Sequence, residues 1–200
     1  AVAAAHARAS GAARVAIVDY DVHHGNGTQH MFEDDGDVLY VSLHQSPFYP
    51  GTGEASETGV GQGAGRTVNV ALEIGAVDED YQVAFADVVL PVLRQFRADL
   101  LIVSAGFDAH ERDPLAGMRL TTAAFGAMTA DLRRVADECC GGRLVAVTEG
   151  GYDLPALADS LRVMVEALGP ERTPAAPWPA SRGVAPARGR AAVASARAAL

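Results

Sequence analysis

The feature that most constrains the fold is a set of short, mostly apolar runs rich in β-branched residues, separated by segments with helical periodicity. The runs are Arg14–Asp19, Val38–Ser42, Thr67–Leu72, Leu100–Ser104 and Leu144–Thr148. Runs of this length are typical of strands that are buried on both faces of a sheet. Strands that alternate with helices indicate parallel pairing. The sequence therefore predicts an α/β domain with a parallel sheet covered on both sides by helices.

Helices are expected between these runs. The predicted helical segments are Thr28–Phe32, Asp78–Phe96, Thr121–Cys139 and Leu154–Leu168, and Ala1–Arg8 has the composition of a helix end. Asp78 is a suitable N-cap, and the pair Gly141-Gly142 is a helix stop signal. Residues 50–65 are rich in glycine and lack periodicity, so we expect a loop there.

Length and charge limit the class of protein. With 200 residues, of which 49% are hydrophobic, the chain can bury the core of one domain. The net charge of -9 argues against direct binding to nucleic acid or to an anionic membrane. No apolar run approaches the roughly 18–20 residues that span a bilayer, and none is placed as a signal peptide. Because Cys139 and Cys140 are adjacent and suggest no structural disulfide, a reduced, cytoplasmic protein is expected.

The use of arginine leads to two further expectations. All 16 basic residues are arginines, which excludes lysine nucleophiles and a phosphate-binding loop and hints at a bacterial origin. From Glu171 to Leu200 there are five arginines and one acid among alanines and prolines. This composition favours a disordered tail over 171–200 rather than a basic contact arm. The domain itself is then expected within residues 1–170.

Polar side chains gather where four of the predicted strands end. These clusters are Asp19–Asn26, Ser42–His44, Gly106–His110 and Glu149–Asp153. In parallel α/β sheets, ligand sites lie beyond the carboxyl ends of the strands. The four clusters are therefore expected to meet at one edge of the sheet and to form one site.

Three residues of these clusters are candidate ligands of a metal ion. Asp21 and His23 stand at alternate positions, which share one face in extended backbone, and Asp108 follows another strand. One imidazole and two carboxylates leave a position for water, which is the arrangement of a catalytic zinc site. The hard donor set leaves ferrous iron and cobalt as alternatives. A binuclear manganese site is less favoured, because Gly25 stands where such sites carry a second carboxylate.

These motifs resemble those of the zinc-dependent histone deacetylases and of their bacterial relatives, the acetylpolyamine amidohydrolases and acetoin-utilisation proteins. The resemblance covers residues 1–168 and rests on Asp19–Gly27, Ser42–His44, Phe48–Gly53, Ser104–Asp108, Asp113-Pro114 and Glu149–Tyr152. The H-H-G-N-G form is closer to the class II and bacterial branch. The resemblance implies a three-layer arginase/deacetylase-like fold, of which this chain is expected to hold the C-terminal part and to lack the N-terminal portion.

The resemblance also implies residue roles. Asp21, His23 and Asp108 would bind zinc, and Tyr152 would donate its hydroxyl to the oxyanion that develops on an acetyl group. The substrate-binding residues would be Tyr49, Gly151 and Leu115. Polyamine-selective relatives carry a glutamate where Leu115 stands, so an acetylated lysine is favoured over a polyamine, with small acetylated amines left open. The oligomeric state is left open as well.

Family members hold a potassium ion beside the zinc, and the matching residues are Asp19, Asp21, His23, Ser42 and Leu43. The family's general base is a tandem histidine pair in a P-G-H-H segment. None of the six histidines here stands in that context: His6, His23, His24, His30, His44 and His110. Asp19 would orient one histidine of that pair.

Because general acid–base catalysis is worth about 10²–10⁴ in rate, we expect little activity from these 200 residues alone. A non-catalytic module that binds metal or acyl groups is the alternative, and a purely structural domain is a third.

Overall fold

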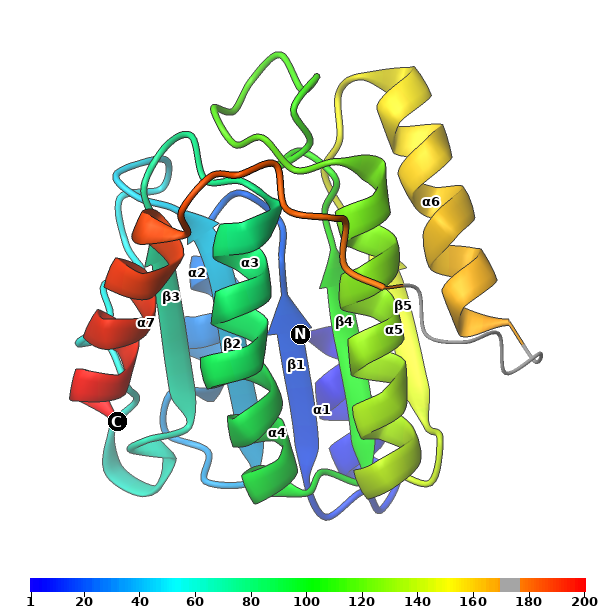
Figure 1. Cartoon of the computed structure of the whole chain (residues 1–200). Helices are drawn as coiled ribbons and strands as arrows, with labels where there is room; N and C mark the ends of the chain where they lie inside the picture. Colours follow the sequence, from blue (N-terminus) through cyan, green and yellow to red (C-terminus); the bar gives the residue numbers. More distant parts are fainter. Residues whose placement is uncertain (170–176) are drawn as a thin grey trace.

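The computed structural model describes residues 1–169 and 177–200 and places one parallel sheet between two layers of helices (Figure 1). Within these residues the strands are β1 (Val15–Asp19), β2 (Val38–Gln45), β3 (Thr67–Leu72), β4 (Leu100–Ala105) and β5 (Leu144–Thr148). The strand order is β3-β2-β1-β4-β5, and all four pairings are parallel. The predicted α/β class and parallel sheet are confirmed.

The helices divide between the two faces of the sheet. The described helices are α1 (Val2–Ala9), α2 (Asn26–Phe32), α3 (Asp78–Ala84), α4 (Leu90–Phe96), α5 (Thr122–Cys139), α6 (Leu154–Leu168) and α7 (Ala187–Ala199). In Figure 1, α3, α4 and α5 lie in front of the sheet, whereas α1 and α2 lie behind it. The predicted helix Asp78–Phe96 contains a π-helical turn, Phe85–Val89, between α3 and α4. Residues 50–65 form the predicted loop, apart from one 3₁₀ turn at Gly61–Gly63.

The two faces are covered unequally. The larger apolar core lies between the sheet and α3, α4 and α5, and is built around Phe85, Phe107 and Phe125. The smaller core, under α1 and α2, includes Ile17 and Ile102. On that second face Val145 and Val147 of β5 stay 45% and 41% exposed, so β5 is the least covered strand.

The register of the strands brings their carboxyl ends into line. Asp19, the last residue of β1, pairs with Ser42 on one side and with Ser104 on the other. On the next strands, Ser42 pairs with Asn69 and Ser104 with Val147. The loops that follow β1, β2, β4 and β5 therefore leave the sheet at one edge, as the sequence predicts.

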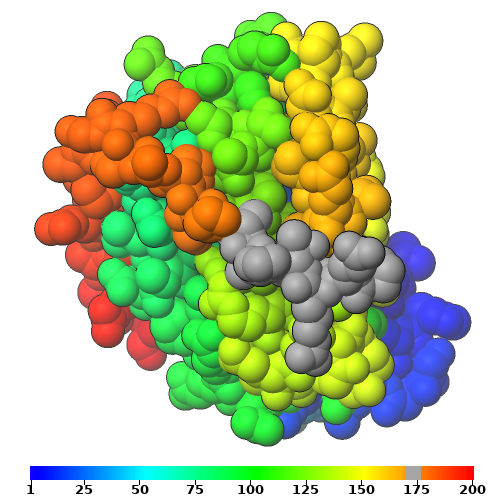
Figure 2. Space-filling view, turned by 45° about the vertical axis from the view of Figure 1, so that its right-hand side comes forward, coloured from blue at the N-terminus to red at the C-terminus, as the bar shows by residue number. Residues whose placement is uncertain are grey.

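The expectation of a disordered tail over 171–200 is wrong for residues 177–200, and 171–176 lie outside the described residues. Helix α7 packs against α3 and β3, and Val193 and Ala196 are buried. The segment that leads to it is held where Trp178 Nε1 donates to Asp131 Oδ2 at 3.0 Å. Figure 2 shows this segment lying across the molecular surface. The composition is misleading because the prolines lie before α7, whereas the helix itself is rich in alanine, which has a high helix propensity. Its small side chains also allow it to pack closely against α3 and β3.

Among the described residues, none of the helices combines the length and the apolar character of a membrane-spanning helix.

Candidate metal centre

The structure brings Asp21, His23 and Asp108 together at the carboxyl edge of the sheet. One ligand atom from each side chain lies within 4.8 Å of the other two. His23 Nδ1 is 3.0 Å from Asp21 Oδ1 and 3.1 Å from Asp108 Oδ2. Asp21 and His23 lie on the segment after β1, while Asp108 lies beyond β4, the strand that pairs with β1. Parallel pairing therefore joins residues 85 or more positions apart into one cluster.

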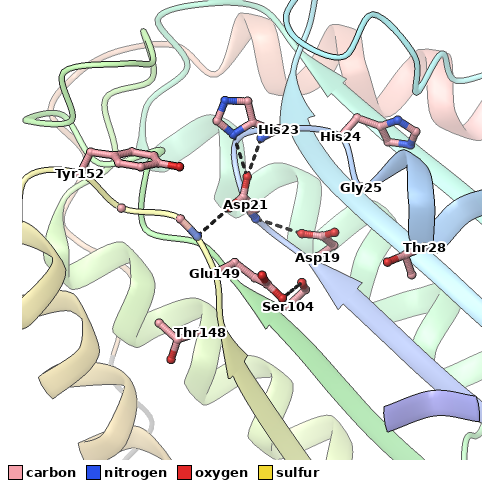
Figure 3. Close-up of a pocket in the computed structure, with 12 residues that line it drawn as sticks. Asp19, Asp21, His23, His24, Gly25, Thr28, Ser104, Thr148, Glu149 and Tyr152 are labelled. Atoms are coloured by element: carbon pink, nitrogen blue, oxygen red, sulfur yellow. Dashed lines mark hydrogen bonds and ion pairs between the residues drawn. The ribbon is translucent and has the colours of Figure 1, made fainter. Parts of the chain in front are cut away.

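The remaining contacts of these carboxylates fix their direction. Asp108 Oδ1 accepts the backbone N–H of Val22 at 2.8 Å. Asp21 Oδ2 accepts the backbone N–H of Gly150 at 3.0 Å, and Asp21 Oδ1 accepts that of His23 at 2.9 Å (Figure 3). Backbone N–H groups therefore hold both the Asp21 and the Asp108 carboxylates in place, with ligand atoms close to that of His23.

Two observations fit this cluster to a divalent cation. Asp108 Oδ2 is buried and accepts no hydrogen bond from the part of the chain that the structure describes. A buried carboxylate oxygen without a partner is costly, and a bound cation would remove that cost. The space beside it is kept free of side chains, since a Cβ at Gly150 would lie 2.4 Å from Asp108 Oδ2 and one at Gly106 would lie 2.3 Å from Asp21 Oδ2.

Burial and mutual repulsion set the charge of the site. Burial, together with the nearby Asp21 carboxylate, raises the pKa of Asp108 well above its usual range. Burial and the same neighbour raise the pKa of Asp19 to about 8. Closely spaced buried carboxylates ionise reluctantly without a counter-charge. A cation at the centre supplies that counter-charge, so this electrostatic pattern agrees with a metal site.

Asp19 lies directly below the cluster. Its Oδ1 accepts the backbone N–H of Asp21 at 3.2 Å and its Oδ2 accepts the hydroxyl of Tyr40 at 3.1 Å. Ser42 is its partner across the sheet, and the Ser42 hydroxyl lies 2.9 Å from His44 Nδ1. Leu43, the next residue of β2, is fully buried. The residues predicted to hold potassium therefore lie around the ends of β1 and β2.

Tyr152 stands on the glycine turn that follows β5, and its ring points toward His23 and Asp21 (Figure 3). Gly151 has φ +141°, a conformation that side-chain-bearing residues rarely adopt. The turn is held on one side by the bond from Gly150 to Asp21. On the other side the backbone N–H of Tyr152 donates to Asp113 Oδ2 at 2.8 Å.

The other two substrate-binding candidates lie at the surface. Tyr49 is 77% exposed and Leu115 is 55% exposed. The Tyr49 ring stands edge-on to His23 with centroids 6.3 Å apart, whereas Phe48 stacks on the same imidazole at 5.1 Å. Sequence reasoning missed Phe48 as a site residue, although it lies inside the quoted F-Y-P-G-T-G motif. The aromatic residue that begins this motif was the available signal.

A cleft of about 530 Å³ runs from Tyr152 to Asp19. Polar residues that the sequence did not single out individually line its floor: Thr28, Ser104, Thr148 and Glu149. Ser104 Oγ donates to Glu149 Oε1 at 3.2 Å. Glu149 belongs to one of the polar clusters that the sequence predicts at the strand ends. Ser104 reaches Glu149 only because β4 pairs with β5.

His24 lies beside the metal cluster and turns away from it. Its Nε2 lies 2.9 Å from Gln29 Oε1 and its Nδ1 lies 2.8 Å from Thr52 Oγ1. Burial lowers the pKa of His24, so the neutral ring is favoured. Both ring nitrogens are occupied, and the residue ties the glycine-rich loop to α2. His24 therefore serves the scaffold of the site.

Comparison with known proteins places this arrangement in a family. Residues 1–168 match the histone deacetylase domain. The chain is 44% identical over 169 residues to Histone deacetylase 14, chloroplastic, of Arabidopsis thaliana, covering 84% of this chain and 40% of that protein. It is also 44% identical over 141 residues to a probable deacetylase of Archaeoglobus fulgidus, covering 70% of this chain and 39% of that protein.

A solved structure shares the fold at clear sequence identity. The HDA15 HD domain superposes with a TM-score of 0.85 at 42% identity, covering 99% of this chain and 53% of that one. The chain therefore spans about half of that domain and less than half of the two curated relatives. The resemblance to the histone deacetylases that the sequence motifs indicate is confirmed over residues 1–168, the predicted range. The chain belongs to the histone deacetylase family.

Proposed function

We propose that this chain carries the metal-binding part of a zinc-dependent deacetylase site that hydrolyses the amide of an acetylated lysine. The observation that carries the proposal is the cluster of Asp21, His23 and Asp108, in which a buried Asp108 oxygen accepts no hydrogen bond from the described residues. Two carboxylates and one imidazole suit zinc and leave a position for water. Membership of the histone deacetylase family supports the same reaction.

The three ligands would hold the ion, and the glycines beside them keep its approach open. Zinc bound there would supply a Lewis acid for the acetyl carbonyl and would lower the pKa of a water molecule that it holds. Tyr152 would donate its hydroxyl to the oxyanion that develops on the carbonyl oxygen. Its place on the Gly150-Gly151 turn, with the ring directed at the metal ligands, supports that role.

Proton handling is the part of the reaction for which these residues are least equipped. A general base must reach the attacking water, and of the six histidines only His23 and His24 line the described cleft. His23 is assigned to the metal, and His24 has both nitrogens engaged. Asp19, buried at the floor of the cleft, would orient an imidazole placed beside it. We therefore expect slow hydrolysis from these 200 residues alone.

The substrate proposal rests on the rim of the site. Tyr49 and Phe48 would flank the acyl-lysine chain, with Gly151 on the opposite side, because both aromatic rings lie against the His23 imidazole. Leu115 is an exposed apolar residue at the position where polyamine-selective relatives carry a glutamate. An acetylated protein lysine or a small acetylated amine is the proposed substrate class. Potassium is proposed at Asp19, Asp21, His23, Ser42 and Leu43.

Chemical rescue with free imidazole tests this proposal. The zinc-loaded chain should release acetate slowly from an acetyl-lysine peptide, and imidazole should raise that rate with saturation. Asp19→Ala should weaken the rescue, and Tyr152→Phe should lower the rescued rate by about 10²–10³-fold, the usual cost of an oxyanion donor. Zinc binding without any hydrolysis under rescue would favour a metal-binding or acyl-binding module. Full turnover without imidazole would show that the base lies within these residues.

A further inference from the structure

The turn that carries Tyr152 is held between two carboxylates. The backbone N–H of Gly150 donates to Asp21 at 3.0 Å, and the backbone N–H of Tyr152 donates to Asp113 at 2.8 Å. Between these two amides lies Gly151, whose φ of +141° belongs to a region that glycine visits freely. Without the second bond, rotation about Gly151 would redirect Tyr152 while leaving Gly150 in place. The Asp113 bond therefore fixes the backbone position from which the Tyr152 side chain projects.

Asp113 uses its other oxygen on a different segment. Its Oδ1 accepts the backbone N–H of Leu115 at 2.9 Å, while Oδ2 serves Tyr152. The residue is only 8% exposed, so both bonds are shielded from competing water. Hydrogen bonds to an ionised carboxylate are shorter and stronger than neutral ones. One buried carboxylate thus fixes the Tyr152 turn and the Leu115 segment relative to each other.

The loop that carries Asp113 is itself anchored at its base and near its far end. At the base, the backbone N–H of Glu111 donates to Leu120 O at 2.9 Å. Near the far end, the backbone N–H of Gly117 donates to Gln45 Oε1 at 2.9 Å, which joins the loop to the end of β2. Asp113 is therefore attached to the sheet edge that bears the metal cluster.

We propose that Asp113 is a positioning residue, which holds the Tyr152 hydroxyl and the Leu115 mouth in one fixed arrangement over the metal ligands. The consequence for function rests on the deacetylase proposal above. Asp113 touches neither substrate nor metal ligand in this scheme and acts through the two backbone amides. A second contact joins the same segments, an ion pair of 3.3 Å between Arg112 and Asp153. Its arginine is half exposed, so its contribution is small and it offers a matched control.

Amide hydrogen exchange on the metal-free 200-residue chain tests the geometry without any catalysis. Asp113→Asn keeps the size of the side chain but turns one acceptor oxygen into a donor, so one of the two bonds is lost. Asp113→Ala removes both acceptors and is measured in parallel, with far-ultraviolet circular dichroism as the check on folding. We expect exchange at Tyr152 or Leu115 to rise about tenfold in the first variant, for a bond worth about 1.4 kcal/mol, and at both amides in the second. Arg112→Gln should leave both amides unchanged.

The second experiment tests whether Asp113 positions the Tyr152 hydroxyl over the metal. It measures the affinity of the zinc-loaded chain for acetohydroxamate, a small zinc chelator with a carbonyl oxygen. Tyr152→Phe and Asp113→Ala should each weaken binding, and the double variant should be no weaker than Tyr152→Phe alone. Additive losses, or unchanged affinity in Asp113→Ala, would overturn the positioning role, as would unchanged exchange at both amides. If the unsubstituted chain binds neither zinc nor the chelator, the deacetylase proposal fails instead, and the exchange result still decides the geometry.

Discussion

Asp108 Oδ2 lies 3.1 Å from His23 Nδ1, yet it accepts no hydrogen bond from the residues that the structure describes. The oxygen is fully buried and belongs to a carboxyl group whose pKa burial raises. Such an arrangement is unfavourable in a metal-free protein and favourable around a cation. The relationship between these two residues thus links the stability of the chain to metal binding.

Zinc should stabilise the chain through this oxygen. At a free zinc concentration about one hundred times Kd, the free energy of unfolding should rise by about 2.7 kcal/mol, and Tm with it. Asp108→Asn should abolish the shift while leaving the metal-free chain equally or more stable, because a repelled buried charge is removed. Scanning calorimetry with zinc and with a chelator measures both. A zinc-induced shift that survives in Asp108→Asn would place the ion elsewhere.

Asp19 should contribute a loss of stability to the metal-free chain as the pH rises from about 4 to about 8. Burial raises the pKa of Asp19 from 3.8 to about 8, so the folded chain keeps a proton there that the unfolded chain has released. Unfolding then releases a proton within this window, and stability falls with increasing pH. Urea denaturation across the window should show that Asp19→Asn gains stability relative to the unsubstituted chain as the pH rises. Asp34→Asn, an exposed substitution, is the control and should show no such gain.

Two glycine-to-alanine substitutions should differ in their effect on zinc binding. A Cβ at Gly150 would lie 2.4 Å from Asp108 Oδ2 and 2.8 Å from Asp21 Oδ2, so Gly150→Ala should displace the ligands and weaken zinc binding at least tenfold. Gly27, within α2, has open space around its Cβ position. Gly27→Ala should leave zinc affinity unchanged and stabilise the chain by about 0.5–1 kcal/mol. Zinc titration by calorimetry measures the affinities; equal affinity in both variants would contradict the assignment of the metal centre.

The sequence predicts the parts of this site that depend on strand periodicity. Asp21 and His23 share a face because they alternate, and Asp108 reaches them because β4 pairs with β1 in register with Asp19. Those features follow from short apolar runs and from the geometry of parallel sheets. The bond from Tyr152 to Asp113 and the stacking of Phe48 on His23 do not follow from any periodicity. Both contacts depend on how the loops fold over the edge of the sheet. Loop conformations of this kind leave no periodic pattern in a single sequence.

The C-terminal helix shows why composition alone fails. Prolines and arginines among alanines predict disorder, whereas α7 packs closely because Gly189 lets its backbone approach that of α3. The backbone N–H of Gly189 donates to Asp80 Oδ1 at 2.8 Å, in a position where a Cβ would collide with the Asp80 backbone. Whether a helix forms there is decided by this tertiary contact, which overrides the local composition.

Gly189→Ala therefore distinguishes a docked helix from a disordered tail. In an isolated helix the change would be stabilising by up to about 1 kcal/mol. Here the added methyl group meets the backbone of α3, so we expect a loss of about 1–3 kcal/mol in the free energy of unfolding, the usual cost of overpacking. Proteolysis of the C-terminal segment should become faster at the same time. Ser195→Ala, on the exposed face of the same helix, should be neutral. If both variants unfold and are cleaved like the unsubstituted chain, α7 is not docked on α3 in solution.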